Sequence, residues 1–270
     1  MKKIAFIGAG SMAEAVFAGL VNKKFVNPEQ IYVSNKENEA RLREIEETYG
    51  VIGTTDKQAV MKDADIVFLA MKPYDLESSL LELRDYVEDD QLFISVIAGK
   101  STSFIQKVLE KDVAVIRSMP NTSATIGLSA TAIAKGAFAS EEDIALTEKI
   151  FSSIGTVSVV EEEQIHIVTG ISGSGPAYVY YLVEAMQIAA EEEGLESETA
   201  RQLISQTIIG AGKMLQERTE SAATLRKNVT SPNGTTAAGI EKLQEHDVKQ
   251  AVIDCVKSAT RRSKELGQEQ

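Results

Sequence analysis

The stretch KKIAFIGAGSMAEA, residues 2–15, has the pattern of a β-strand that runs into a glycine turn and then into a helix. Gly8 ends the apolar run, and Gly10 and Ala13 follow it at the spacing G-x-G-x-x-A. In this arrangement the first glycine makes a tight turn and the second lets the backbone approach a pyrophosphate, while the third small residue allows close packing of helix on strand. The stretch therefore predicts a dinucleotide-binding turn, with nucleotide contacts at Gly8, Gly10, Ser11 and Met12.

Outward from this turn, short β-branched runs alternate with helical stretches as far as residue 160, which is typical of a mainly parallel sheet with helices on both faces. After residues 161–166 the strand signal stops and long helical patterns follow. We expect an α/β, Rossmann-like, doubly wound domain over residues 1–160 and an all-α domain over residues 161–270. The expected strands are 2–8, 30–35, 50–55, 65–71, 91–97 and 113–119, with 128–135 and 155–160 extending the edge; the expected C-terminal helices are 176–193, 197–217, 222–228, 236–244 and 249–266.

Composition excludes several classes of protein. The 270 residues carry a formal net charge of −12, which argues against binding to a nucleic-acid backbone, and no apolar run reaches the roughly 20 residues that cross a bilayer. Cys255 is the single cysteine, which fits a reducing cytoplasm, and the two histidines, His166 and His246, are too far apart for the common zinc spacings. A soluble cytoplasmic protein without a metal site is expected.

Two helical segments have apolar faces too wide for a small solitary bundle. They are YVYYLVEAM, residues 178–186, and LISQTIIGA, residues 203–211. Wide apolar faces of this kind need a covering surface, so we expect the helical domain to form a dimer with a second copy of the chain.

The end of the second expected strand indicates which dinucleotide binds. An acidic residue usually stands here in proteins that prefer NAD, but this chain has Ser34, Asn35 and Lys36. Hydroxyl, amide and ammonium groups suit a 2′-phosphate, so the sequence favours NADPH over NADH, although Lys36 could also be a solvated surface residue beside Glu37. Further nucleotide contacts are expected past other strand ends, at Ala70, Met71, Lys72, Pro73, Ala98, Gly99 and Asn121.

Several blocks, in order along almost the whole chain, resemble the pyrroline-5-carboxylate reductase family. They are GAGSMAEA (8–15), SNK (34–36), LAMKP (69–73), SVIAG (95–99), RSMPNT (117–122), SGSGPAY (172–178), SQTIIGAGKML (205–215) and VTSPNGTTAAG (229–239). The resemblance implies reduction of 1-pyrroline-5-carboxylate to L-proline with NAD(P)H, the last step of proline biosynthesis. It also implies a Rossmann domain followed by a helical domain that interlocks with a partner subunit, as a homodimer or a ring of dimers.

The block VTSPNGTTAAG contains no charged residue, which suits a carboxylate site made of backbone. A turn at residues 230–234 followed by a helix would leave converging N–H groups at the positive end of the helix dipole. We expect Ser231, Asn233, Gly234, Thr235 and Thr236 to bind the substrate, and the resemblance suggests that the Thr236 hydroxyl hydrogen-bonds the imine nitrogen as the catalytic contact. An ordinary helix cap is the structural alternative.

Two other functions remain open at this point. A β-hydroxyacid dehydrogenase has a similar layout, but such enzymes carry a lysine soon after the interdomain glycines, and none occurs here between Gly175 and Lys213. A noncatalytic NADP(H)-binding sensor is the second alternative. Three departures from the family pattern leave room for it: Lys57 where Asn is usual, Ser123 where Pro is usual and Asn233 where Gly is usual.

Overall fold

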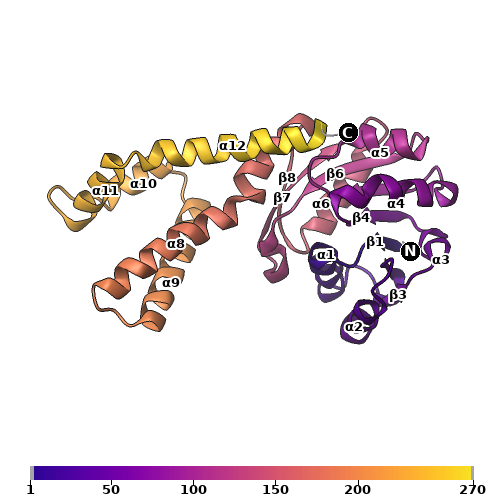
Figure 1. Cartoon of the computed structure of the whole chain (residues 1–270), viewed down its shortest axis with the longest axis horizontal. Helices are drawn as coiled ribbons and strands as arrows, with labels where there is room; N and C mark the ends of the chain where they lie inside the picture. The colour runs from indigo at the N-terminus through magenta and orange to yellow at the C-terminus, as the bar shows by residue number, and fades with distance from the viewer. Residues whose placement is uncertain (1–2, 269–270) are drawn as a thin grey trace. The chain divides into compact units, whose positions relative to one another are not determined.

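An eight-stranded sheet forms the first part of the chain in the computed structural model, which describes residues 3–268 (Figure 1). The strand order is β3-β2-β1-β4-β5-β6-β7-β8. Strands β1 to β6 pair with one another in parallel, which is the order and direction of a Rossmann sheet. All eight expected strands are confirmed: β1 Ile4–Ile7, β2 Ile31–Ser34, β3 Ile52–Thr54, β4 Ile66–Leu69, β5 Leu92–Ser95, β6 Ala114–Met119, β7 Ser129–Lys135 and β8 Gly155–Val159.

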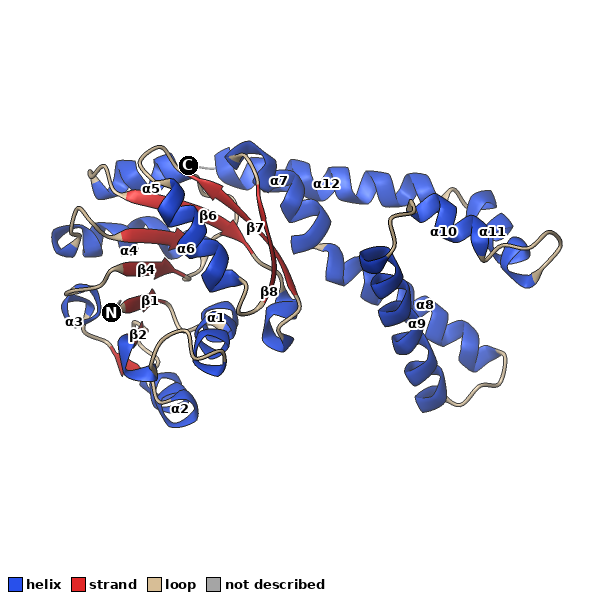
Figure 2. Ribbon diagram, turned by 180° about the vertical axis from the view of Figure 1, so that it is seen from behind, coloured by secondary structure: helices blue, strands red, loops and turns tan. Residues whose placement is uncertain are grey.

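Helices cover both faces of this sheet, as the period of two in the strand residues requires (Figure 2). In β1, Ile4 and Phe6 belong to one core cluster, and Ala5 and Ile7 belong to the other. The first cluster lies under α1 (Ser11–Asn22), α2 (Glu39–Tyr49) and α6 (Glu141–Phe151). The second lies under α3 (Lys57–Met61), α4 (Leu76–Leu83) and α5 (Thr102–Leu109). The helix α3 was not among the predicted elements, because five residues are too few to show a helical period.

Strand β7 is antiparallel to β6, and β8 is parallel to β7. Between β6 and β7 the chain has only a 3₁₀-helix, Thr122–Ile126. A parallel return needs a crossover of a dozen or more residues, so this short connection forces the antiparallel pairing. Other 3₁₀-helices are Pro28–Gln30, Pro73–Asp75, Arg84–Tyr86 and Glu162–Gln164.

The contacts divide the chain into two compact units. One contains the residues up to Pro176 together with those from Lys257 onward, and the other is Ala177–Val256. This division lies later than the predicted domain boundary at residue 160. The segment past 160 packs on the sheet, because Ile165 of α7 (Ile165–Val168) clusters with Ala132 and Ala134 of β7.

The end of the chain also belongs to the sheet-containing unit. His166 Nδ1 lies 3.0 Å from Ser263 Oγ, and Gly267 packs so closely on Gly99 that a Cβ on Gly267 would lie 2.6 Å from the Gly99 carbonyl oxygen. The segment from 161 onward is helical, as predicted. Its first residues, up to Pro176, and its last residues, from Lys257, belong to the sheet-containing unit.

The second unit is entirely helical, as predicted (Figure 2). Its helices are α8 (Gly175–Glu192), α9 (Ser197–Glu217), α10 (Ala222–Asn228), α11 (Thr235–Glu245) and the first part of α12 (Val248–Gln268). Large apolar side chains on these helices are exposed in a single chain, among them Tyr181, Ile188, Leu203 and Ile209. Within residues 3–268, no helix is long and apolar enough to cross a membrane.

Candidate active site

The turn after β1 requires glycine at position 8. Gly8 has a φ of +114°, and a Cβ there would lie 2.6 Å from the carbonyl oxygen of Ala70. Its N–H donates to the carbonyl oxygen of Ser34 at 2.9 Å. The turn therefore ties together the carboxyl ends of β2, β1 and β4, at the point in the strand order where doubly wound sheets bind nucleotides.

The start of α1 is open. Gly10 is the N-cap in extended backbone, with φ −78° and ψ 173°, and no side chain caps the helix. The N–H of Glu14 donates to the Gly10 carbonyl, but across residues 3–268 no acceptor is found for the N–H groups of Ser11, Met12 and Ala13. A Cβ on Gly10 would meet nothing within 4 Å, so a pyrophosphate has room against this backbone. The turn therefore fits the nucleotide that its sequence predicts.

A network from α2 supports this turn. Arg41 Nε donates to the carbonyl oxygen of Ala9 at 3.2 Å, and its guanidinium pairs with Glu14 and Glu44. The Tyr49 hydroxyl also donates to Glu14, at 2.9 Å. The pKa of Arg41 is raised, first by the hydrogen bond to Glu44. Sequence reasoning missed this network, because no local pattern links α1 to α2.

The residues past β2 have distinct tasks. Ser34 is buried and holds Gly8 through its carbonyl. Asn35 Oδ1 accepts from the N–H groups of Glu37 and Asn38 at 3.2 and 3.1 Å, so its side chain shapes the loop. Lys36 is exposed. Of these three, Lys36 is the residue whose charge is available to a ligand.

The remaining predicted nucleotide contacts lie past β4 and β5. Ala70 and Met71 are partly buried, and Lys72 caps the 3₁₀-helix that begins at Pro73, with both of these residues exposed. Ala98 is partly buried, whereas Gly99 is buried with a φ of +81°. The space expected to hold a flat ring beside Gly99 is bordered by α12: a Cβ on Gly99 would lie 3.2 Å from Leu266 Cβ. Gly99 thus has a structural reason to be glycine, and its nucleotide contact stays a prediction.

Asn121 is 8% exposed, and its side chain is engaged within the fold. Its Oδ1 accepts from the N–H of Ser123 at 3.1 Å, and its Nδ2 donates to the carbonyl oxygen of Ser172 at 3.0 Å. Ser172 belongs to a π-helix, Thr169–Gly173, which leads into α8. Asn121 therefore fixes the glycine-rich entry to α8, and a direct contact of its side chain with the nucleotide stays a prediction.

The uncharged turn before α11 adopts the predicted shape. Asn233 has a φ of +60°, a left-handed conformation that Asn tolerates better than most residues. Gly234 is the N-cap, with φ −84° and ψ 171° and no side-chain cap. Its N–H donates to the Ser231 carbonyl at 3.1 Å, and a Cβ on Gly234 would overlap Ser231 Oγ. Ser231, Asn233 and Gly234 thus form one compact turn.

The first turn of α11 presents donors in place of charges. Gly234 N–H is used inside the turn, but the N–H groups of Thr235, Thr236 and Ala237 have no acceptor within residues 3–268. The side chains of Thr235 and Thr236 are exposed. Three amide donors at the positive end of a helix, with two hydroxyls beside them, can hold a carboxylate and hydrogen-bond a second polar atom.

The two histidines take no part in either helix start. His166 contacts Ser263, and its pKa is lowered, first by burial and then by the charges of Arg117 and Lys264. The contact with Ser263 gives His166 a structural role. His246 is exposed at the end of α11. Among residues 3–268, no three His, Cys, Asp or Glu residues lie where they could hold a metal ion.

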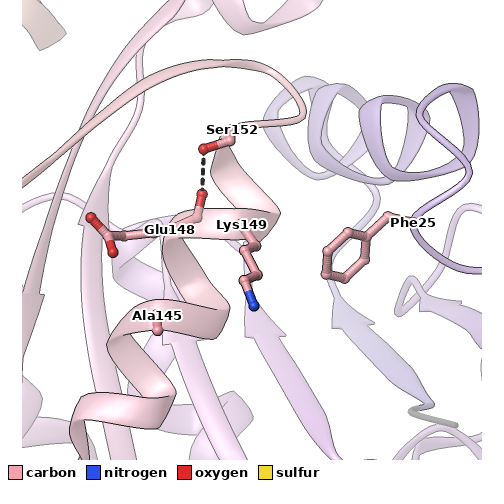
Figure 3. Close-up of a pocket in the computed structure, with 5 residues that line it drawn as sticks. All are labelled: Phe25, Ala145, Glu148, Lys149 and Ser152. Atoms are coloured by element: carbon pink, nitrogen blue, oxygen red, sulfur yellow. Dashed lines mark hydrogen bonds between the residues drawn. The ribbon is translucent and has the colours of Figure 1, made fainter.

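A shallow hollow lies between the segment after α1 and helix α6 (Figure 3). Phe25, Glu148, Lys149 and Ser152 line it together with Ala145. Phe25 follows the end of α1, and the helix separates it from Gly10 by roughly 18 Å of helical rise. The hollow is therefore not part of the nucleotide turn.

The sheet order, the Gly8 turn and the open start of α1 define a dinucleotide-binding protein of the Rossmann type. Residues 3–99 match the family model "NADP oxidoreductase coenzyme F420-dependent", and residues 162–266 match "Pyrroline-5-carboxylate reductase dimerisation". The chain belongs to the pyrroline-5-carboxylate reductase family, which confirms the resemblance seen in its sequence.

Curated relatives and solved structures agree with this membership. Pyrroline-5-carboxylate reductase 1 of Bacillus spizizenii is 46% identical over 265 residues, covering 98% of this chain and 89% of the relative. The pyrroline-5-carboxylate reductase structure from Coxiella burnetii has a TM-score of 0.91 at 37% identity, with 98% of each chain covered. The Plasmodium falciparum pyrroline carboxylate reductase, solved with NADP bound, has a TM-score of 0.89 at 26% identity, again over 98% of each chain.

Proposed function

We propose that the chain is a pyrroline-5-carboxylate reductase, which reduces 1-pyrroline-5-carboxylate to L-proline with NADPH in the last step of proline biosynthesis. Its curated relatives carry that name at 39–46% identity over nearly the whole chain. The activity is an oxidoreductase reaction at a C–N bond, EC 1.5.1.2. Membership of the family and the two open helix starts support the same conclusion.

The observation that carries the proposal is the pair of glycine N-caps, Gly10 and Gly234. Each leaves the first N–H groups of its helix without an acceptor within residues 3–268. Hydride reduction of an imino acid needs two anion sites, one for the pyrophosphate and one for the substrate carboxylate. We assign the helix start at Gly10 to the pyrophosphate and the one at Gly234 to the carboxylate; they lie in different units of the chain.

In this proposal, NADPH supplies the hydride, and the residues of the chain bind and orient. Gly10, Ser11 and Met12 hold the pyrophosphate with backbone N–H groups, and Lys36 attracts the 2′-phosphate. The N–H groups of the α11 start, with the Ser231 and Thr235 hydroxyls, hold the substrate carboxylate. Gly8, Ala70, Met71, Lys72, Pro73, Ala98, Gly99 and Asn121 form the walls on which the nucleotide lies.

Thr236 is the proposed catalytic contact. Its hydroxyl hydrogen-bonds the ring nitrogen, which receives electrons as hydride reaches the adjacent carbon. A protonated iminium is already activated, so positioning supplies most of the remaining acceleration, and a strong general acid is not required. The proton on the ring nitrogen stays there as the amine forms.

NADPH is the proposed coenzyme, with NADH as a possible second. The Plasmodium falciparum relative was solved with NADP bound, and the residues 34–36 of this chain lack the acidic group that holds an unphosphorylated ribose. We also propose that the chain works as a homodimer or a ring of dimers in the cytoplasm. The match to the dimerisation model and the exposed apolar side chains of α8 and α9 support the dimer.

The direct test mixes the purified full chain with NADPH and 1-pyrroline-5-carboxylate and follows the loss of absorbance of the reduced nicotinamide. We expect turnover with proline as the product. Nucleotide binding without turnover would instead support the noncatalytic sensor. Oxidation of β-hydroxyacids in a second assay with NADP+, without imine reduction in the first, would support the dehydrogenase. The same assay with NADH compares the coenzymes.

A further inference from the structure

The peptide between Ala9 and Gly10 lies in the middle of the turn after β1. Ala9 stands between Gly8 and Gly10, and because glycine has no Cβ, local sterics leave this backbone unusually free to rotate. The peptide is trans, so its C=O and N–H point in opposite directions. Rotation of this one peptide would therefore present the Ala9 carbonyl oxygen, in place of the Gly10 N–H, to a bound anion.

Arg41 of α2 fixes the orientation of this peptide. Its Nε donates to the Ala9 carbonyl oxygen at 3.2 Å, so the Gly10 N–H points to the side of the turn opposite Arg41. Across the part of the chain that the structure describes, residues 3–268, that N–H has no acceptor, and neither have the N–H groups of Ser11 and Met12. The bond from Arg41 thus leaves the Gly10 donor available to a ligand.

The Arg41 guanidinium is itself held in place. Its two terminal nitrogens pair with Glu14 of α1 and Glu44 of α2, and its side chain is 19% exposed. Tyr49 donates a hydrogen bond to Glu14 at 2.9 Å and packs edge-on against Phe17, with 5.3 Å between the ring centroids. Because the donors of a guanidinium form a rigid fork, these partners leave Nε directed at the turn.

Glu14 gives Arg41 a second task. This carboxylate belongs to the first turn of α1 and follows Gly10 by four residues, which places it on the same side of the helix. An unbalanced negative charge there would repel a pyrophosphate. Arg41 balances that charge, so loss of Arg41 would both release the Ala9 carbonyl and leave Glu14 without its cation.

We propose that Arg41 is a positioning residue for the pyrophosphate of the coenzyme, acting through the Ala9 carbonyl and Glu14 and making no contact with the nucleotide itself. This assignment rests on the proposed nucleotide function and deepens it. NADPH and NADH share the pyrophosphate, so Arg41 strengthens the binding of both equally. It contributes affinity and no selectivity between them.

The test measures nucleotide binding by the full chain and its variants, without turnover. Nicotinamide fluorescence gives Kd for NADPH and NADH. Calorimetry gives Kd for adenosine 5′-diphosphate, which has a pyrophosphate, and for adenosine 2′-monophosphate, which has none. We expect Arg41→Met to weaken NADPH, NADH and the 5′-diphosphate each about tenfold, because an amide donor loses its orientation and a negative charge loses its partner. The 2′-monophosphate should bind as before.

The matched control is Arg43→Met, which removes the same charge from the same helix. The Arg43 side chain is 70% exposed and pairs with Glu39 at 3.6 Å. Its loss should change no Kd. Thermal unfolding of each variant shows whether it is folded, and a role of Arg41 in stability alone would lower the unfolding temperature without the pattern among the four ligands.

Two further variants separate the two tasks of Arg41. Arg41→Lys keeps a positive charge beside Glu14, but an ammonium lacks the fork that reaches Ala9 at the same time, so it should recover only part of the lost affinity. Adding Glu14→Gln to Arg41→Met removes the unbalanced carboxylate and should also recover only part. Full recovery in this double variant would overturn the role of the Ala9 bond.

The remaining outcomes are distinct. Weakening of NADPH and the 2′-monophosphate alone would make Arg41 a direct contact of the 2′-phosphate and overturn its positioning role. Unchanged Kd values in a folded Arg41→Met variant, or equal losses in Arg43→Met, would also overturn it; if Arg41→Met does not fold, Arg41→Lys takes its place. A chain that binds the 5′-diphosphate through Arg41 but does not reduce 1-pyrroline-5-carboxylate would overturn the proposed reaction and support this assignment.

Discussion

The starts of α1 and α11 have nearly the same backbone, although their sequences and units differ. Gly10 and Gly234 are both N-caps in extended conformation, with ψ values of 173° and 171°, and neither helix has a side-chain cap. In each, the first internal bond comes from the fourth helical residue, Glu14 or Ala238, to the glycine carbonyl. In the proposed function, the same arrangement, a helix start without a side-chain cap, binds a phosphate in one unit and a carboxylate in the other.

Other helices of the chain show what an ordinary start looks like. Ser140 caps α6 and Ser221 caps α10 by accepting a bond from the N–H three residues later, at 3.1 and 3.2 Å. Ser221 caps the helix that directly precedes α11 in the chain, so the missing side-chain cap at Gly234 is specific to the α11 start. Replacing such a side-chain cap by glycine costs only about a few tenths of a kcal/mol, so the two glycine N-caps leave the amide donors open at little cost in stability.

The largest expected effect comes from placing a carboxylate at the α1 start. Gly10→Asp should weaken NADPH binding about a hundredfold, because a negative side chain meets the pyrophosphate and competes for its N–H groups. The fold should tolerate the change, since a Cβ at Gly10 has open space and Asp is a favoured cap. Fluorescence titration gives Kd, and thermal unfolding checks the fold.

The matched control for that variant is Ser140→Asp, which puts the same charge at the already capped start of α6. It should leave NADPH binding unchanged. If both variants weakened NADPH binding equally, the change in net charge would explain the loss. The proposed pyrophosphate site at the start of α1 would then be refuted.

At the α11 start, Thr236→Ala should lower kcat/KM about ten- to a hundredfold and leave the Kd of NADPH unchanged. The reason is the loss of one hydrogen bond to a charged nitrogen, which contributes roughly 1.5–3 kcal/mol. Steady-state kinetics and nucleotide titration measure the two quantities. Thr236→Ser, which keeps the hydroxyl, should recover most of the activity; unchanged kinetics in the alanine variant would refute the role of Thr236.

The smallest expected effect concerns the turn that precedes α11. Asn233 has a φ of +60°, so Asn233→Ala should destabilise the fold by about 1 kcal/mol and raise KM a few-fold. Asn233→Gly, which restores the usual family residue, should leave both nearly unchanged. Thermal unfolding and substrate titration test this, and a stable alanine variant with normal KM would show that the turn does not depend on this conformation.

Local patterns predicted most of this architecture. The alternating runs located all eight strands, and the helical periods located α8 to α12, because burial on one face leaves a clear period in the residues. The Gly8 turn was predictable because its geometry requires glycine. The φ of +114° and the close contact with Ala70 exclude other residues, so the glycine is visible in the sequence. The α11 turn was predictable from small, uncharged residues together with the family resemblance.

What could not be predicted depends on contacts between distant segments. Arg41 reaches Ala9 and Glu14 across about thirty positions, and no local period records that bond. The engagement of Asn121 with Ser172 is equally non-local. The antiparallel direction of β7 could have been predicted from the sequence, because the connection from Met119 to Ser129 is too short for a crossover helix.

The return of α12 to the sheet-containing unit makes the helical unit an insertion between two segments of the first one. Exchanging helical units between relatives by recombination therefore requires two crossover points, near Pro176 and Lys257. A chimera with one crossover would pair Gly99 and His166 with a foreign C-terminal segment, at positions where Gly267 and Ser263 fit closely. The two ends of this gene should accordingly evolve together, more tightly than either does with the middle.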